Sequence, residues 1–169
     1  MAISLYSGFV PVCLQLLGGL KTVLQKAEAH ASEHKWDAGV VLNLRLYPDM
    51  FPLERQVRQV CNHALGAARV AGVDLPSFPD ADNSFAESYA RIDKTIDFLK
   101  GLSPSKLDGK DDSEVTVTVG GQPRAFKASN YLYHFAMLQV QFHCTTAYNI
   151  IRHVGVTIGK RDYLGPQPS

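Results

Sequence analysis

His143 is the residue with the clearest capacity for chemistry in this sequence. It lies on the face of a predicted helix that is otherwise formed by aliphatic side chains, so its imidazole is predicted to be buried. Gln139 and Thr146 lie about one helical turn before and after it, which makes a polar strip along an apolar helix. Such an imidazole can act as an acid, a base or a ligand. The alternative is a core histidine held by one hydrogen bond, the commoner situation for buried polar groups. Gln139, His143 and Thr146 are the candidate interior site.

A metal at His143 needs further ligands, which the sequence does not place. Ala147 stands four residues after it, where a second histidine would complete a helical pair, and Gln139 stands four residues before it. His30 and His34 have the spacing of such a pair, but they lack a third ligand, and the C-terminal end of a helix accounts for both. The sequence therefore predicts no metal and no other cofactor. A divalent metal at His143 is the less favoured alternative.

Asn62 and His63 are the other residues on which a site around His143 could draw. They belong to a helix predicted at 52–72, and they fall on either side of its apolar stripe, well away from its centre. Both are therefore predicted to face solvent or an interface.

Arg45 and Asp49 lie in an apolar segment that contains two prolines. An arginine four residues before an aspartate can form an ion pair or fix a turn to a helix end. A structural role is favoured, because exposed pairs contribute little and buried pairs demand good geometry.

The elements that would position these residues are mostly helices. Apolar residues recur at helical spacing in four long segments, at about 9–34, 52–72, 84–101 and 129–154, and a short helix and a turn are predicted within 37–50. Strict alternation at 114–119, followed by Gly120-Gly121, predicts a β-hairpin at about 114–127. The fold class is all-α: a four-helix bundle domain at 1–155 with one small hairpin. Residues 156–169 are predicted to form an extended tail packed on or flanking the bundle.

Composition narrows the class of protein further. The chain has 169 residues, with 17 basic and 16 acidic residues and a formal charge of +1, and it has no basic stripe, which argues against nucleic acid as a partner. Three widely spaced cysteines without a C-x-x-C pair predict a reducing, cytoplasmic location.

Two stretches, 1–20 and 128–151, contain no Asp, Glu, Lys or Arg. The first lacks the basic start of a signal peptide, and the second contains amide, imidazole and hydroxyl side chains that would cost several kcal/mol in lipid. Both are predicted to be helices inside a protein and not membrane spans. Apolar residues surround more than half of the 129–154 helix, so it is predicted to be the most buried one.

Several longer motifs carry a family resemblance: 44–53 (LRLYPDMFPL) with Gln56-Val57, 142–148 (FHCTTAY), 152–156 (RHVGV) and 158–165 (IGKRDYLG). Together they resemble an uncharacterised bacterial and fungal family, a domain of unknown function within the DinB/YfiT-like superfamily. The resemblance implies a four-helix bundle, often a homodimer. Many members of the superfamily hold a divalent metal with one histidine on helix 2 and an H-x-x-x-H pair on helix 4, and they include thiol-dependent transferases and hydrolases. His143 matches the first position of that pair, Ala147 stands at the second, and Asn62 and His63 are nearest on helix 2.

Two functions follow as expectations. The first is a homodimeric protein that binds a small molecule or a partner and lacks the three-histidine metal site. The alternative is a metal-dependent hydrolase or thiol transferase with a modified site around His143. The residues leave open whether the protein is an enzyme.

Overall fold

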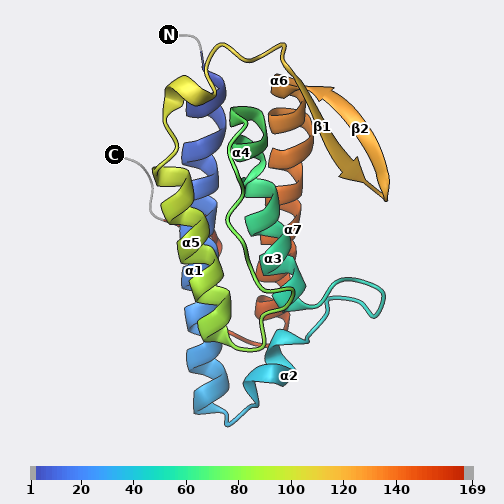
Figure 1. Cartoon of the computed structure of the whole chain (residues 1–169). Coiled ribbons are helices and arrows are strands. Elements are labelled where there is room, and N and C mark those ends of the chain that lie inside the picture. Colours follow the sequence, from blue (N-terminus) through green and yellow to red (C-terminus); the bar gives the residue numbers. More distant parts are fainter. Residues whose placement is uncertain (1–2, 166–169) are drawn as a thin grey trace.

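The computed structural model describes residues 3–165, which are mostly helical and include one two-stranded antiparallel sheet. The longest helices lie side by side along a common direction (Figure 1): α1 (Leu5–Glu33), α3 (Leu53–Ala64), α5 (Phe85–Lys100) and α7 (Met137–His153). Shorter elements connect or extend them: α2 (Ala38–Leu42), α4 (Gly66–Ala71), η1 (Pro104–Lys106), α6 (Ala128–Asn130), η2 (Tyr131–Ala136) and α8 (Lys160–Leu164). The four long helices and the hairpin are thus present where the sequence predicts them, with three differences described below.

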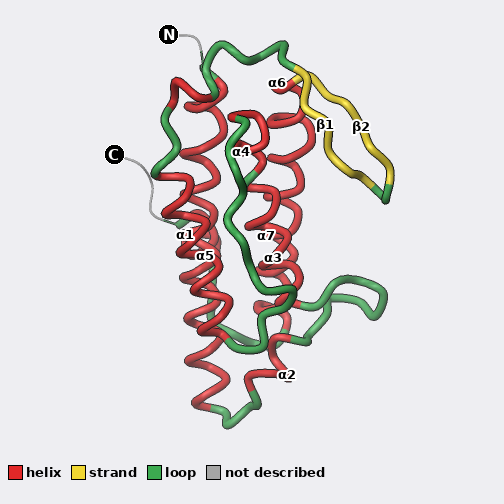
Figure 2. The backbone as a smooth tube through the Cα atoms, viewed as in Figure 1, coloured by secondary structure: helices red, strands yellow, loops and turns green. Residues whose placement is uncertain are grey.

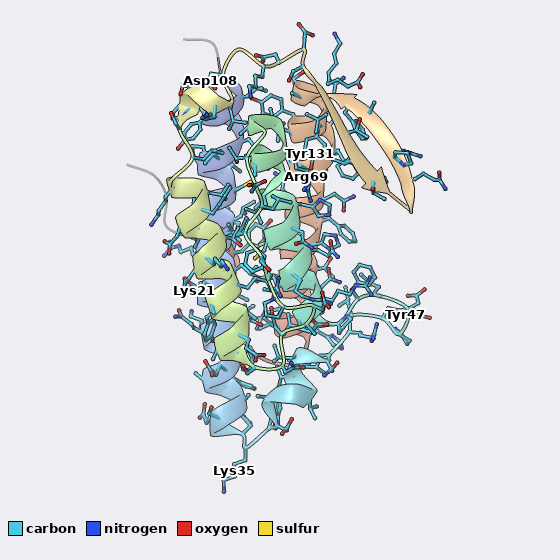
Figure 3. The ribbon with its side chains drawn as sticks, in the orientation of Figure 1. Lys21, Lys35, Tyr47, Arg69, Asp108 and Tyr131 are labelled. Carbon is cyan, nitrogen blue, oxygen red and sulfur yellow. The ribbon has the colours of Figure 1, made fainter. Side chains whose placement is uncertain are left out.

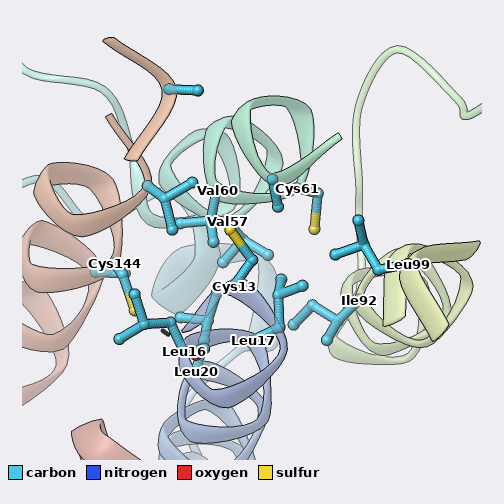
Figure 4. Close-up of a cluster of buried hydrophobic side chains, with 14 of the residues drawn as sticks. Cys13, Leu16, Leu17, Leu20, Val57, Val60, Cys61, Ile92, Leu99 and Cys144 are labelled. Atoms are coloured by element: carbon cyan, nitrogen blue, oxygen red, sulfur yellow. Dashed lines mark hydrogen bonds between the residues drawn. The ribbon is translucent and has the colours of Figure 1, made fainter. Parts of the chain in front are cut away.

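The core lies where the long helices meet. A buried apolar stripe along α1 faces α3, α5 and α7, and side chains of all four helices converge in Figure 4. The outer side of α7 is different, because Leu138 and Phe142 are each 56% exposed there. The prediction that this helix would be the most buried one therefore fails on its outer face.

Helix α1 starts earlier than predicted. The Ser4 side chain accepts a hydrogen bond from the backbone N–H of Ser7, and the Ser7 side chain in turn accepts one from the backbone of Ser4. This cap starts the helix four residues before the predicted position and leaves Pro11 inside it. By length and composition α1 is the one helix in the described part that could cross a membrane, with a mean hydropathy of 1.4 over its most apolar 18-residue window. Half of that window is buried inside the protein, as expected of a core helix.

The helix predicted at 52–72 is divided into α3 and α4. Leu65, between them, has a ψ of 3°, which interrupts the helix, whereas Gly72 ends α4 in the predicted left-handed conformation. Gly66, the first residue of α4, comes close to η2, since a Cβ there would lie 3.2 Å from Ala136 Cβ. The break lets the chain approach η2 at this point.

The helix predicted at 129–154 is also interrupted. Its first part is α6 and the π-helical turn η2, after which α7 continues as regular α-helix. The hairpin directly before it consists of β1 (Glu114–Val119) and β2 (Gln122–Lys127), joined by Gly120 and Gly121 with positive φ. In Figure 1 the hairpin extends from the end of the molecule at which α6 begins, and it lies beside α7 and α3.

The prediction of an extended tail is wrong over 160–164, where the chain forms α8 on the side of α1. Gln15 Nε2 donates to the carbonyl oxygen of Leu164, and Lys26 Nζ lies 2.7 Å from an Asp162 carboxylate oxygen. At Gly19 a Cβ would overlap the carbonyl oxygen of Tyr163, so the absence of a side chain permits the contact between α1 and α8. Residues 166–169 of the predicted tail lie outside the described residues.

The loop at 73–83 runs along the face between α3 and α5 (Figure 2). It is held by cations from both helices: Arg58 and Lys94 donate to its carbonyl oxygens, and Arg91 forms an ion pair with Asp82. The loop is therefore part of the packed structure.

Candidate functional site

His143 lies on the side of α7 that faces α3, and its side chain has a buried partner there. Its Nδ1 lies 2.7 Å from Gln56 Oε1, and Gln56 Nε2 donates to the carbonyl oxygen of Phe51 at 3.0 Å. His143 is 7% exposed and Gln56 is 1% exposed. Because the Gln56 carbonyl oxygen can only accept, His143 carries its proton on Nδ1 and keeps Nε2 as an acceptor.

Gln56 was not among the candidates that the sequence yields. It is a polar residue between apolar positions of α3, and this interruption of the apolar pattern is the signal that could have found it.

His63, predicted to face solvent or an interface, is half-buried and lies against His143. Its ring is parallel to that of His143, with centroids 5.8 Å apart and an interplanar angle of 5°, and the Phe51 ring is also parallel to His143, with centroids 6.3 Å apart. The reason is that α3 packs against α7 as well as against the core, and His63 stands seven residues after Gln56, on the same side of the helix. Asn62 is exposed, as predicted.

Both imidazoles are neutral at pH 7. Burial lowers the pKa of His143 to about 4. Burial, and then the nearby His143 and Arg69, lower the pKa of His63 to about 4. The charged neighbour that lowers the pKa of His63 is the cation Arg69. Because both rings are neutral, each presents one N–H donor and one acceptor nitrogen.

A cleft of about 500 Å³ opens between His63 and the hairpin. Three elements beside the hairpin form its walls: α3, α4 and η2. Figure 3 shows that the Arg69 and Tyr131 side chains lie near each other there. The lining residues are Gln59, Asn62, His63, Arg69, Thr116, Val117, Thr118, Tyr131 and Phe135. The cleft combines one guanidinium, amides, hydroxyls and aromatic rings, and none of its lining residues is acidic.

The three side chains predicted to form one polar strip on α7 face different parts of the structure. His143 faces α3, whereas the Thr146 hydroxyl donates to the carbonyl oxygen of Phe142 within its own helix and borders a separate groove on the outer side of α7. Gln139 is half-buried and lines neither the cleft nor that groove. The structure therefore brings His143 together with Gln56 and His63 of α3 and not with Gln139 and Thr146.

The residues around His143 do not fit a three-histidine metal site. Ala147 is buried at the position of the second helix 4 ligand, and Gln56 already occupies His143 Nδ1. Within 3–165 no three histidine, cysteine, aspartate or glutamate side chains come together as a metal-binding group. His30 and His34 stack on each other at 4.0 Å near Trp36, at the far end of α1.

Arg45 and Asp49 are both exposed, and Arg45 donates to the carbonyl oxygen of Met50. An Arg45–Asp49 ion pair is not among those formed within residues 3–165. Arg45 thus closes the loop between α2 and α3 through the backbone.

Comparison with known proteins agrees with this architecture. The family model described as "Domain of unknown function (DUF1993)" matches residues 5–164. The chain belongs to this family. A crystal structure of a DinB family member protein from Shewanella denitrificans is similar to this DUF1993 protein, with 34% sequence identity, a TM-score of 0.86, and coverage of 98% of this chain and 94% of the other. These matches confirm the family resemblance drawn from the sequence motifs. No curated protein matches the chain.

Proposed function

We propose that this DUF1993 protein is a cytoplasmic, homodimeric small-molecule-binding protein, built as a DinB-type four-helix bundle without the three-histidine metal site. The side-by-side packing of α1, α3, α5 and α7, together with the likeness to a DinB family member, supports the bundle. The donor set around His143 supports a site that works without the metal, because Ala147 supplies no ligand.

The cleft beside His63 is the observation that carries the binding function. Its volume of about 500 Å³ is within the range of pockets for small molecules, roughly 300–1,000 Å³. Its polar groups come from three separate helical elements and a strand, and they converge on one space beside two aromatic rings. A preformed space with a few converging polar groups is the usual form of a small-molecule site.

A variant that fills the cleft tests this function. Thr118→Trp places an indole in the cleft from β1, and Thr157→Trp, at an exposed threonine outside the cleft lining, is the matched control. We expect members of a fragment library to raise the Tm of the wild-type protein and of the control, but not that of Thr118→Trp. Fragments that stabilise Thr118→Trp equally well, or a library without any hit on the wild-type protein, would overturn the proposal.

The proposed homodimer uses the outer face of α7. Leu138 and Phe142 are exposed there, in a stretch without charged side chains, and Leu46 and Met50 of the neighbouring loop border the same groove of about 480 Å³. A second copy of this face brings no like charges together, and uncharged apolar surface is typical of the centre of an interface.

Sedimentation analysis decides between a dimer and a monomer. We expect a dimer for the wild-type chain and a monomer for Phe142→Glu, because a carboxylate at the centre of an apolar interface loses its hydration. Leu75→Glu, at an exposed apolar position on the 73–83 loop, is the control and remains dimeric. A monomeric wild-type protein would exclude the homodimer.

The second candidate function is a metal-dependent hydrolase or thiol transferase with a modified site. One observation favours it: His143 Nε2 is free to accept, and the neutral His63 ring lies beside it. Metal analysis of untagged protein separates the two functions. One equivalent of zinc or nickel that disappears in His143→Ala would establish the second candidate and exclude the first, whereas protein without bound metal supports the first.

A further inference from the structure

The charge of the cleft indicates the kind of ligand that it takes. Arg69 is the single charged residue of the lining, and its guanidinium forms no hydrogen bond or ion pair within residues 3–165. A guanidinium presents five N–H donors in a planar fork that matches the two oxygens of a carboxylate. Arg69 is exposed and its donors are accessible to solvent, and no acidic lining residue offsets its charge, so the cleft favours an anion over a cation.

The positive charge of the cleft limits the charge that its ligand can carry. His63, the other basic group of the lining, is neutral at pH 7, since its pKa is lowered to about 4. One positive charge therefore remains to balance the ligand. A single guanidinium matches a monoanion such as a carboxylate better than the dianion of a phosphate monoester.

Aromatic side chains form the wall beside Arg69. The rings of Tyr131 and Phe135 stack at 5.9 Å, and Phe126 of β2 packs against both. The rings of His63 and Phe135 form a T-shaped pair with centroids 5.8 Å apart. Aromatic faces of this kind bind planar rings in offset or edge-on arrangements.

Tyr131 adds a hydroxyl to the cleft beside Arg69. It is 2% exposed and lines the cleft, but its hydroxyl has no hydrogen-bond partner within the described chain. Burial raises the pKa of Tyr131, and the charge of Arg69, which lines the same cleft, acts in the opposite direction. Among the described residues the one fully buried polar side-chain atom without a partner is Ser88 Oγ, so the Tyr131 hydroxyl oxygen is accessible in the cleft and is free to bond a ligand oxygen near Arg69.

We propose that the cleft binds a small planar aromatic carboxylate, with its carboxylate on Arg69 and the Tyr131 hydroxyl and its ring against Phe135. The amides of Gln59 and Asn62 and the neutral His63 imidazole are then available for polar substituents on the ring. This inference rests on the proposed function, because it takes the cleft as the binding site.

Binding of simple probes to the full-length protein, followed by NMR titration, tests the ligand class. The probes are benzoate, 4-hydroxybenzoate and 2-naphthoate, each compared with its carboxamide, with cyclohexanecarboxylate as the non-planar acid and phenyl phosphate as the dianion. We expect each aromatic acid to bind at least tenfold more tightly than its amide, and 2-naphthoate to bind more tightly than cyclohexanecarboxylate.

Variants identify the groups responsible. Arg69→Gln should weaken the acids at least tenfold and leave the amides unchanged, whereas Arg124→Gln, which removes an exposed cation of β2 outside the lining, should change neither. Phe135→Leu should weaken acids and amides alike. Equal binding of acids and amides, or equal losses in Arg69→Gln and Arg124→Gln, would overturn the inference.

The outcomes also separate this inference from the proposed function. If fragments bind in the cleft and are lost in Thr118→Trp, but aromatic acids are not preferred, the ligand class is wrong and the binding function stands. If no fragment and no acid binds the wild-type protein, both fail.

Discussion

At the scale of single residues, the hydrogen bond from His143 to Gln56 determines which ring nitrogen of His143 carries the proton. Gln56 is itself fixed by the Phe51 carbonyl, so the three groups form a short buried chain from the loop before α3 to α7. The burial of a histidine with a polar partner could be predicted from the sequence. The identity of that partner could not, because the match between Gln56 and His143 depends on how α3 and α7 are aligned along their lengths.

The two stacked histidines make stability depend on pH. Both have a pKa of about 4 in the folded protein, below the ordinary value of 6.5, so the unfolded chain takes up protons first as the pH falls. Their contribution is complete above about pH 6.5 and is lost as the pH falls toward 4. We expect a loss of about 2 kcal/mol in the free energy of unfolding between pH 7 and pH 5, after allowance for the incomplete burial of His63.

Urea unfolding at the two pH values measures this effect. The double variant His63→Gln, His143→Gln should lose most of the pH dependence, while His153→Gln, at an exposed position of α7, should keep it. An unchanged pH dependence in the double variant would show that other groups are responsible.

At the scale of elements, the loop at 73–83 is held to α5 by one buried ion pair. Arg91 Nε lies 2.8 Å from Asp82 Oδ2, Arg91 also donates to the carbonyl of Pro79, and both side chains are almost fully buried. We expect Asp82→Asn to lower the free energy of unfolding by about 3 kcal/mol, because it leaves a buried guanidinium without its counter-charge. Chemical denaturation measures the loss. Asp112→Asn, which breaks an exposed pair with Lys127, is the control and should leave stability unchanged.

The contact between α8 and α1 depends on the small size of Gly19. We expect Gly19→Ala to displace α8 and to cost about 1–3 kcal/mol, since the added methyl meets the Tyr163 backbone. Faster hydrogen exchange of α8 would report the displacement. In Gly101→Ala the added methyl meets its nearest atoms at an ordinary 3.5 Å, and α8 should remain protected.

These elements show where sequence reasoning works and where it stops. The hairpin is found at its predicted residues because alternation and the Gly120-Gly121 turn are local signals. The break at Leu65, the π-helical turn and α8 were missed, because each depends on contact with another part of the chain. Gly66 lies against Ala136, and Gly19 lies against Tyr163, which no local pattern records.

At the scale of the whole molecule, three free thiols from three different helices lie in the common core: Cys13 of α1, Cys61 of α3 and Cys144 of α7 (Figure 4). Burial raises the pKa of Cys61 and of Cys144 to about 12 and that of Cys13 still further. The thiolate is the reactive form, so these cysteines are inert in the folded protein.

We therefore expect a thiol reagent such as DTNB to label none of the three without prior unfolding, and to label all three together in urea. The labelling midpoint should coincide with that measured by circular dichroism. A cysteine introduced at the exposed Ser105 is the positive control and should react at once in native buffer. Separate labelling midpoints for the native thiols would show that the helices do not unfold as one unit.

The π-helical turn η2 also bears on how this architecture varies among relatives. Such a turn contains one residue more than regular α-helix would use, and each residue of an α-helix turns the chain by about 100°. With one residue fewer between Ala128 and Met137, α6 and the hairpin would swing by that angle about the axis of α7, while His143 would keep facing α3. The hairpin would then lie beside a different groove, and the cleft beside His63 would lose the wall that β1 forms. Among family members, we expect the length of this turn to determine whether the hairpin forms a wall of the cleft. Members that differ by a single insertion or deletion at the turn should have a cleft that is open on that side.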